Sequence, residues 1–199
     1  MARKWTYTTS LAMVALLIAS GCHAADLKIG DAAPDWSGIP GTDGKKHSLS
    51  DYKDAKVIVM VFTCNHCPTA VAYQDRLKEF QKDYGKKGVQ LIAVNVNNLP
   101  ADKLDKMKER AEKEKFNFPY IYDSSQKMGR DYGAKTTPHL FVLCKERKVA
   151  YIGAMDDNGK ADKVKEHYLR DAVDALLAGK KPEKTETRPT GCSVKYEKK

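Results

Sequence analysis

The chain has 199 residues, a mass of 22.2 kDa and a formal net charge of +9, which suits one domain of ordinary size with short ends. The lysines alternate with acids along the whole chain and have no interleaved aromatic residues, which argues against a nucleic-acid-binding protein. Five cysteines, an odd number, argue against a scaffold held together by disulfides.

Residues 1–24 have the pattern of a secretory signal peptide. Arg3 and Lys4 precede the apolar stretch 11–19, which is too short to span a bilayer. Residues 19–22 resemble a lipoprotein signal, in which Cys22 would be lipidated, and residues 22–24 equally fit cleavage for soluble export. We therefore expect an exported protein of the periplasm or cell envelope, which contacts a membrane only through a lipid anchor at Cys22.

The region between the leader and the first long strand predicts a β-hairpin. Asp43-Gly44 is a strong two-residue turn signal between short extended pieces, and residues 50–52 predict a turn or short helix. Residues 57–62 are then continuously apolar and mostly β-branched, as is typical of a strand that is buried on both faces.

Two cysteines with two residues between them follow this strand. Because residues 70–84 have helical periodicity, we expect Cys64 to open a helix, where unpaired N–H groups and the helix dipole favour a thiolate. Cys64 is thus the predicted nucleophile. Cys67 lies one turn further on, and it is expected to attack the mixed disulfide and close a Cys64–Cys67 bond.

Three other interpretations of the pair stay open. A zinc site needs a second ligand pair, and the remaining candidates, Cys144, Cys192, His66 and His139, are irregularly spaced. A structural disulfide over so short a loop would constrain the unfolded chain little. Two buried unreactive thiols are possible, but Asn65, His66 and Pro68 form a polar, turn-like segment that is unlike a protein core. Cys144 itself is expected to be a lone thiol at a strand end.

The rest of the chain predicts further strands and helices in alternation. Residues 89–96 form a second buried strand, so that strand, helix and strand imply a parallel right-handed crossover. A charged helix from Pro100, an extended piece at 118–123 and a short helix at 124–132 follow. Residues 139–144 and 148–153 predict an antiparallel hairpin, and residues 164–177 a final helix. Residues 26–179 are therefore one domain, and residues 180–199, which contain almost no aliphatic side chains, are an extended tail.

This order of elements, with Thr137-Pro138 leading into the hairpin, resembles the thioredoxin fold. The motif Gly30-x-x-Ala33-Pro34-x-Trp36 resembles the amino-terminal part of peroxiredoxins and of exported thiol-disulfide oxidoreductases of the ResA/TlpA type. The sequence is most similar to the peroxiredoxin-like branch that keeps a Cys-x-x-Cys motif. The resemblance implies an α/β fold with a central mixed sheet flanked by helices and an N-terminal β-hairpin extension.

The same resemblance implies roles for several residues. Pro138 would be cis and pack beside the disulfide, and Thr137 would offer backbone hydrogen bonds to an extended substrate. His66, directly before the second cysteine as in oxidising members such as protein disulfide isomerase, would stabilise the Cys64 thiolate; an exposed His66 without a partner is the alternative. The branch often ends in a Gly-Cys-Ser tail. We therefore hypothesise that the tail folds back and that Cys192 acts as a third redox cysteine, against a disordered or merely structural tail.

The sequence thus predicts an exported thiol-disulfide oxidoreductase that needs no dissociable cofactor, because the electrons reside in the dithiol. Its partners would be an envelope redox partner and client proteins with thiols or disulfides, including apocytochromes if the ResA likeness holds. Two alternatives remain. A thiol peroxidase would use Cys67 as its peroxidatic cysteine, with Cys64 in place of a threonine and Arg130 as its arginine. A copper-binding module would use Cys64 and Cys67 with His139 or His66.

Overall fold

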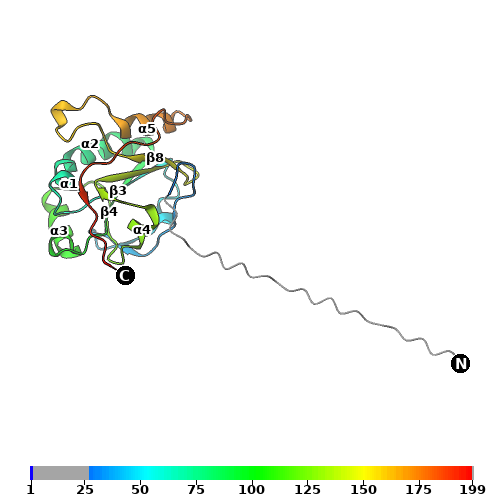
Figure 1. The fold of residues 1–199 in the computed structure, drawn as a ribbon, viewed down its shortest axis with the longest axis horizontal. Helices are drawn as coiled ribbons and strands as arrows, with labels where there is room; N and C mark the ends of the chain where they lie inside the picture. The colour runs from blue at the N-terminus through cyan, green and yellow to red at the C-terminus, as the bar shows by residue number, and fades with distance from the viewer. Residues whose placement is uncertain (2–26, 199) are drawn as a thin grey trace.

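A five-stranded mixed sheet forms the centre of the computed structural model, which describes Met1 and residues 27–198. Residues 2–24 of the predicted leader, with the candidate anchor residue Cys22, lie outside the described residues. The strands follow the order β5-β4-β3-β7-β8 (Figure 1). β3, β4 and β5 run parallel, whereas β7 is antiparallel to both β3 and β8. Their bounds are β3 (Val57–Phe62), β4 (Val89–Asn95), β5 (Tyr120–Tyr122), β7 (His139–Leu143) and β8 (Val149–Gly153).

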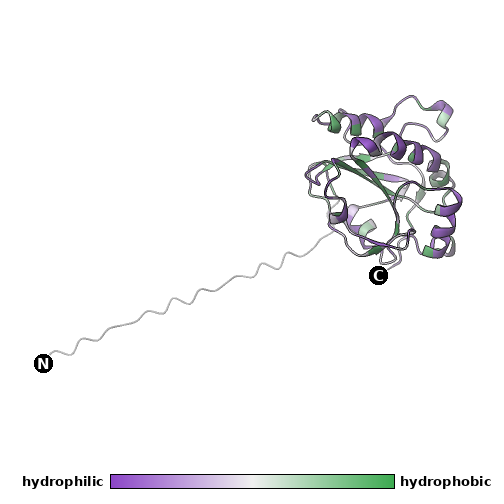
Figure 2. Ribbon diagram, turned by 180° about the vertical axis from the view of Figure 1, so that it is seen from behind, coloured by the Kyte–Doolittle hydropathy of each residue, from purple (hydrophilic) through white to green (hydrophobic). Residues whose placement is uncertain are grey.

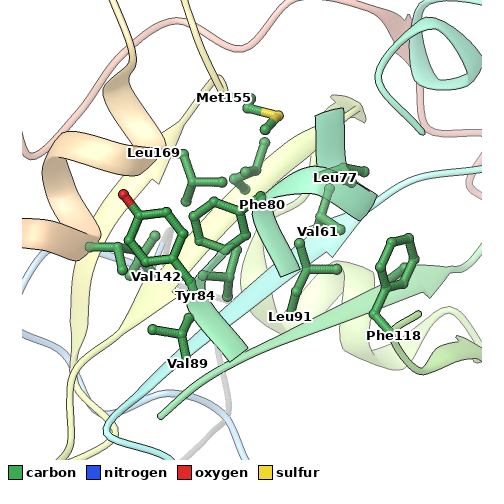
Figure 3. Packing of buried hydrophobic residues seen from close by; sticks show 14 of the residues in the cluster. Val61, Leu77, Phe80, Tyr84, Val89, Leu91, Phe118, Val142, Met155 and Leu169 are labelled. Atoms are coloured by element: carbon green, nitrogen blue, oxygen red, sulfur yellow. The ribbon is translucent and has the colours of Figure 1, made fainter. Parts of the chain in front are cut away.

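The central strand β3 is buried on both faces, as its unbroken apolar sequence predicts. Its side chains alternate between the two faces with the period of two of a β-strand. One face packs on α2 and α5, and Figure 3 shows Val61 close to Leu77 and Phe80 on this side. The other face, with Phe62, packs on Tyr132 of α4. In Figure 2 the central strands are coloured mostly hydrophobic, whereas the helices around them alternate between hydrophilic and hydrophobic residues.

In the described part of the chain, five α-helices surround the sheet: α1 (Pro68–Ala72), α2 (Gln74–Tyr84), α3 (Leu104–Lys113), α4 (Lys127–Tyr132) and α5 (Tyr168–Leu177). The single helix predicted after the cysteines is two helices that meet at Tyr73, which caps both of them. The final helix begins four residues later than predicted, because residues 161–163 form a separate 3₁₀ turn and Val164 is extended. Gly133 ends α4 with a φ of +68°, a conformation that glycine adopts without steric cost. Among the described residues, no helix is long and apolar enough to cross a membrane.

The N-terminal hairpin is confirmed as β1 (Ile39–Pro40) and β2 (Lys46–His47), with Gly44 at a φ of +80° in its turn. Gly41, which directly follows β1, forms an antiparallel β-bridge with Ile121 of β5. The hairpin is therefore attached to the edge of the main sheet. Three-residue or four-residue 3₁₀ turns lie at Leu49–Tyr52, Gly85–Lys87, Pro100–Asp102 and Ala161–Lys163.

The C-terminal tail is extended, and it packs back on the domain. Its strand β9 (Cys192–Ser193) pairs antiparallel with β6 (Thr136–Thr137), with Cys192 opposite Thr137. Figure 1 shows this last segment running along the body of the domain toward the C-terminus. Because β6 directly precedes Pro138, the tail reaches the region where the sequence predicts the substrate groove.

Candidate active site

The chain leaves β3 at Phe62 and reaches the two cysteines before any helix begins. α1 starts at Pro68, and Cys67 is its N-cap, whose Sγ accepts a hydrogen bond from the Ala70 N–H at 3.4 Å. Proline suits the first helical position because its φ is preset and its missing N–H is not needed there. The prediction that Cys64 opens the helix is therefore wrong, because Cys64 lies four residues before Pro68.

Cys64 is a buried thiol, 1% exposed, and its Sγ lies 3.3 Å from the hydroxyl oxygen of Thr137. Burial raises the pKa of Cys64 to about 12, with a smaller contribution from the negative charge of Asp102. The hydrogen bond with Thr137 opposes this rise without cancelling it. The predicted low pKa of Cys64 is thus also wrong in this structure, because burial, with the smaller contribution of the Asp102 charge, outweighs the hydrogen bonds that favour the Cys64 thiolate.

Cys67 is the cysteine that ionises more easily, although its exposed fraction is 0%. Burial opposes its ionisation, but hydrogen bonds from the Cys192 thiol and from the Ala70 N–H outweigh burial, so the pKa of Cys67 is lowered. In its thiol form, Cys67 donates to the carbonyl oxygen of Thr137 at 3.2 Å. The structure therefore assigns to Cys67 the thiolate character that the sequence predicts for Cys64.

Asp102 organises the loop between the cysteines. Its carboxylate is fully buried, and Oδ1 accepts from the backbone N–H groups of Asn65, at 2.7 Å, and of His66, at 3.3 Å. The other oxygen lies 2.5 Å from Nδ1 of His66. His66 therefore has a partner, and it binds the carboxylate from a position next to Cys64.

Asp102 is not among the site residues predicted from the sequence, although its position after a parallel strand indicates it. β3 and β4 run parallel, so their carboxyl ends meet at the same edge of the sheet. Asp102 follows β4 by a few residues, and the cysteines follow β3. An acid after the neighbouring parallel strand is thus a candidate for the site.

Thr137 and Pro138 lie where the sequence predicts. The Thr137–Pro138 peptide bond is cis, and Thr137 contacts both sulfurs, through its hydroxyl to Cys64 and through its carbonyl to Cys67.

His139 does not contact the two cysteines in this way. Its Nδ1 accepts a hydrogen bond from the Lys135 N–H at 3.3 Å, and its ring packs on Phe141 with 4.6 Å between ring centroids. Burial lowers the pKa of His139 to about 4, so the ring is neutral at pH 7.

The metal site expected for a copper module is not assembled as predicted. In the described part of the chain, the group that could hold a metal ion combines Cys64 with His66 and Asp102, with ligand atoms within 4.8 Å of one another. Cys67 and His139 are not in this group. Asp102 already accepts two backbone N–H groups and the His66 ring, so hydrogen bonding accounts for the cluster.

Arg130 and Cys144 lie away from the cysteine pair. The Arg130 guanidinium stacks over the Tyr196 ring at 4.6 Å and donates to the carbonyl oxygen of Glu197 at 2.7 Å. Cys144 follows β7, whose start pairs with Phe62 and whose end pairs with Ile58. Cys144 therefore lies at the opposite edge of the sheet from the site, as a lone thiol. Cys192, in contrast, packs against Cys64, Cys67 and Ala70.

Residues 28–168 match the Redoxin family. The chain belongs to this family. It is 29% identical over 126 residues to the thiol-disulfide oxidoreductase ResA of Geobacillus thermodenitrificans, a match that covers 62% of this chain and 68% of ResA. It is 28% identical over 107 residues to the peroxiredoxin Bcp of Escherichia coli K12, covering 54% of this chain and 65% of Bcp.

Two solved structures of unassigned function are more similar over a greater length. A hypothetical protein from Sinorhizobium meliloti 1021 superimposes with a TM-score of 0.81 and 31% identity, covering 87% of this chain and 97% of that one. An uncharacterized conserved protein from Geobacillus kaustophilus gives a TM-score of 0.81 and 33% identity, covering 86% and 93%. This redoxin is therefore a thioredoxin-like, thiol-based redox protein. Its identity to ResA, 29%, and to Bcp, 28%, is nearly the same, so the two matches do not distinguish disulfide exchange from peroxide reduction.

Proposed function

We propose that this redoxin is an exported thiol-disulfide oxidoreductase that exchanges electrons with protein thiols and disulfides through Cys64 and Cys67. The observation that carries the proposal is the convergence of both sulfurs on Thr137, beside the cis peptide bond to Pro138. A dithiol next to an extended backbone segment can hold a client strand while its disulfide is exchanged.

The lowered pKa of Cys67 and the raised pKa of Cys64 favour Cys67 as the attacking sulfur, and the proposed steps follow that order. The Cys67 thiolate attacks one sulfur of a client disulfide, which forms a Cys67–client bond and releases a client thiolate that takes up a proton. Cys64 gives up its proton and attacks the Cys67 sulfur, which closes the Cys64–Cys67 disulfide and releases the second client thiol. The client gains two electrons and two protons. An envelope redox partner then reduces the Cys64–Cys67 bond, and the reverse sequence oxidises client thiols.

Reduction of insulin by dithiothreitol in the presence of the protein tests this reaction. We expect the protein to accelerate reduction, and Cys64→Ser or Cys67→Ser to remove at least 90% of the acceleration. Cys144→Ser is the matched control, because Cys144 is at the far edge of the sheet, and it should keep the activity of the parent. Full activity in the Cys64→Ser/Cys67→Ser double variant would refute the assignment.

Export belongs to the same proposal, and it is supported by the signal pattern of residues 1–24. Cell fractionation of the full chain tests it, with the protein expected in the envelope fraction. Cys22→Ser separates the two cleavage sites, because it abolishes membrane attachment if Cys22 is lipidated and changes nothing if export is soluble. Full-length, uncleaved protein in the cytosolic fraction would contradict export.

A thiol peroxidase is the second candidate, favoured by the lowered pKa of Cys67 and by the similarity to Bcp. Arg130 does not support it, because its guanidinium binds the C-terminal segment. Consumption of hydrogen peroxide with a thiol reductant distinguishes the two reactions. We expect a rate at least 100-fold below that of insulin reduction, and the opposite ratio would favour the peroxidase.

A further inference from the structure

The backbone of β6 is already occupied by the chain's own tail. β9 pairs antiparallel with β6, Cys192 lies opposite Thr137, and the Thr137 hydroxyl donates to the Cys192 carbonyl oxygen at 3.4 Å. Thr137 is also the residue that contacts both Cys64 and Cys67. A cysteine in an extended strand thus lies where a client cysteine would have to lie.

Gly191 allows this strand to come so close. A Cβ atom at this position would lie 2.0 Å from the Thr137 carbonyl oxygen and 2.8 Å from its carbonyl carbon. Both atoms are backbone atoms next to the cis peptide bond, so they cannot move aside cheaply. The approach of the tail to the site therefore depends on glycine at residue 191.

The tail beyond β9 is anchored as well. Val194 is buried against the core, and the Lys195 N–H donates to Oδ1 of Asn97 at 2.7 Å. Gln126, which is 2% exposed, donates from Nε2 to the Lys195 carbonyl oxygen at 2.8 Å and accepts from the Glu197 N–H at 2.8 Å. These contacts hold the chain directly after β9, and Cys192 packs against Cys67.

We propose that residues 191–194 are a resident redox strand, in which Cys192 exchanges with Cys67 to form an internal Cys67–Cys192 disulfide while the strand occupies the client position on Thr136–Thr137. The proposal rests on the thiol-disulfide exchange proposed above. Cys192 is partly exposed, whereas Cys64 and Cys67 are 1% and 0% exposed. Cys192 is thus the sulfur of this cluster that an external thiol can reach with the tail in place.

The exchange needs no external oxidant or reductant, because one disulfide forms as another breaks. Cys192 loses its proton, and its sulfur attacks the Cys67 sulfur of the Cys64–Cys67 disulfide. The Cys67–Cys192 bond forms, the Cys64–Cys67 bond breaks, and the Cys64 sulfur leaves with the bonding electrons and takes up one proton. No electrons enter or leave. The raised pKa of Cys64 favours retention of that proton in the product.

Trapping with oxidised glutathione tests the proposal. In Cys64→Ser protein, Cys67 and Cys192 remain, and two-electron oxidation by glutathione disulfide should join them in most molecules, as mapped by mass spectrometry of unreduced peptides. Cys64→Ser/Cys144→Ser should give the same bond. Cys64→Ser/Cys192→Ser should instead stop at a Cys67–glutathione mixed disulfide.

Gly191→Ala tests the strand itself. Added to Cys64→Ser, it should lower the yield of the Cys67–Cys192 bond at least tenfold. Gly159→Ala is the matched control, because a Cβ there meets nothing within 4 Å, and added to Cys64→Ser it should leave this yield unchanged.

The two proposals can fail separately. If Cys64→Ser protein has the circular dichroism spectrum of the natural chain and yet forms only the glutathione adduct of Cys67, the resident-strand proposal is overturned. If the natural chain neither reduces insulin nor forms a Cys64–Cys67 bond at any glutathione ratio, the proposed function is overturned instead.

Discussion

Asp102 is the residue that links the order of the active-site loop to the ionisation of its first cysteine. The carboxylate is fully buried, and hydrogen bonds from the backbone N–H groups of Asn65 and His66 and the contact with the His66 ring satisfy it. A buried carboxylate with such partners stabilises the loop that it holds. Burial is the main cause of the raised pKa of Cys64, and the charge of Asp102 adds to it, so the same residue holds the loop and favours the thiol form of Cys64.

Replacing Asp102 with Asn separates these two effects. The amide keeps the shape but loses one acceptor and the charge, so we expect the free energy of unfolding to fall by about 1–3 kcal/mol. The pKa of Cys64 should fall as well, although burial keeps it above that of a free cysteine. Urea unfolding and thiolate absorbance in a Cys67→Ser background measure the two quantities.

The control for this change is Asp105→Asn, because Asp105 is an exposed acid in the first turn of α3. It should alter neither the free energy of unfolding nor the ionisation of Cys64. An unchanged pKa of Cys64 in the Asp102→Asn protein would show that the carboxylate does not act on the sulfur.

His139 predicts how stability depends on pH. Burial lowers its pKa from 6.5 to about 4 in the folded protein. Between these values the unfolded chain binds a proton that the folded chain does not, so stability is complete above pH 6.5 and falls as the pH drops. The loss from this group by pH 5 is about 2 kcal/mol, from 1.36 kcal/mol for each pKa unit.

Urea unfolding of the natural chain and of His139→Gln, at pH 7 and pH 5, checks this expectation. The natural chain should lose about 2 kcal/mol more than the variant between the two pH values. Taking the difference removes the contribution of the other titrating groups. Equal losses would mean that the His139 ring is protonated in the folded protein.

At the scale of elements, the sequence predicts what periodicity and residue type encode locally. β3 and β4 are continuous apolar runs, and α2 repeats its apolar positions at helical spacing, so these elements and their parallel connection are predictable. The start of α1 is less predictable, because Pro68 places the N-cap at Cys67, whose sulfur accepts hydrogen bonds from the Cys192 thiol and from the Ala70 N–H. Residue composition does not predict which residue becomes the N-cap of α1.

The tail shows where local pattern gives no information. β9 has two residues, which is too short for any periodicity, and the residues around it are mostly polar. Its position depends on distant partners, since Gly191 must pass the Thr137 carbonyl and Lys195 must reach Asn97. Burial of Asp102 is equally non-local, because it depends on the parallel pairing of β3 and β4. The sequence therefore supports the hypothesis that Cys192 returns to the site, and the register and the contact with Cys67 require the structure.

At the scale of the whole molecule, a buried ion pair connects the helical layer to the chain that follows β8. Arg76 of α2 lies 2.5 Å from Oδ2 of Asp156, and their side chains are 12% and 4% exposed. The Tyr73 hydroxyl donates to Oδ1 of the same carboxylate at 2.8 Å. The guanidinium also donates to the carbonyl oxygens of Asn158 and Gly159. One arginine thus joins the end of α1, the start of α2 and the 156–159 loop.

Removing one member of this pair should destabilise the fold strongly, because it leaves the other charge buried without a partner. We expect Arg76→Met and Asp156→Asn each to lower the free energy of unfolding by about 3–5 kcal/mol. The double variant should lose at least about 1 kcal/mol less than the sum of the two, since neither charge remains to be compensated. Urea unfolding of all four proteins gives this coupling energy, and Lys106→Ala, which breaks an exposed pair with Glu109, should change nothing measurable. Additive losses would mean that the two residues stabilise the fold independently, and the helical layer would then be held to the loop after β8 by the packing of Leu77 and Met155 in the shared core.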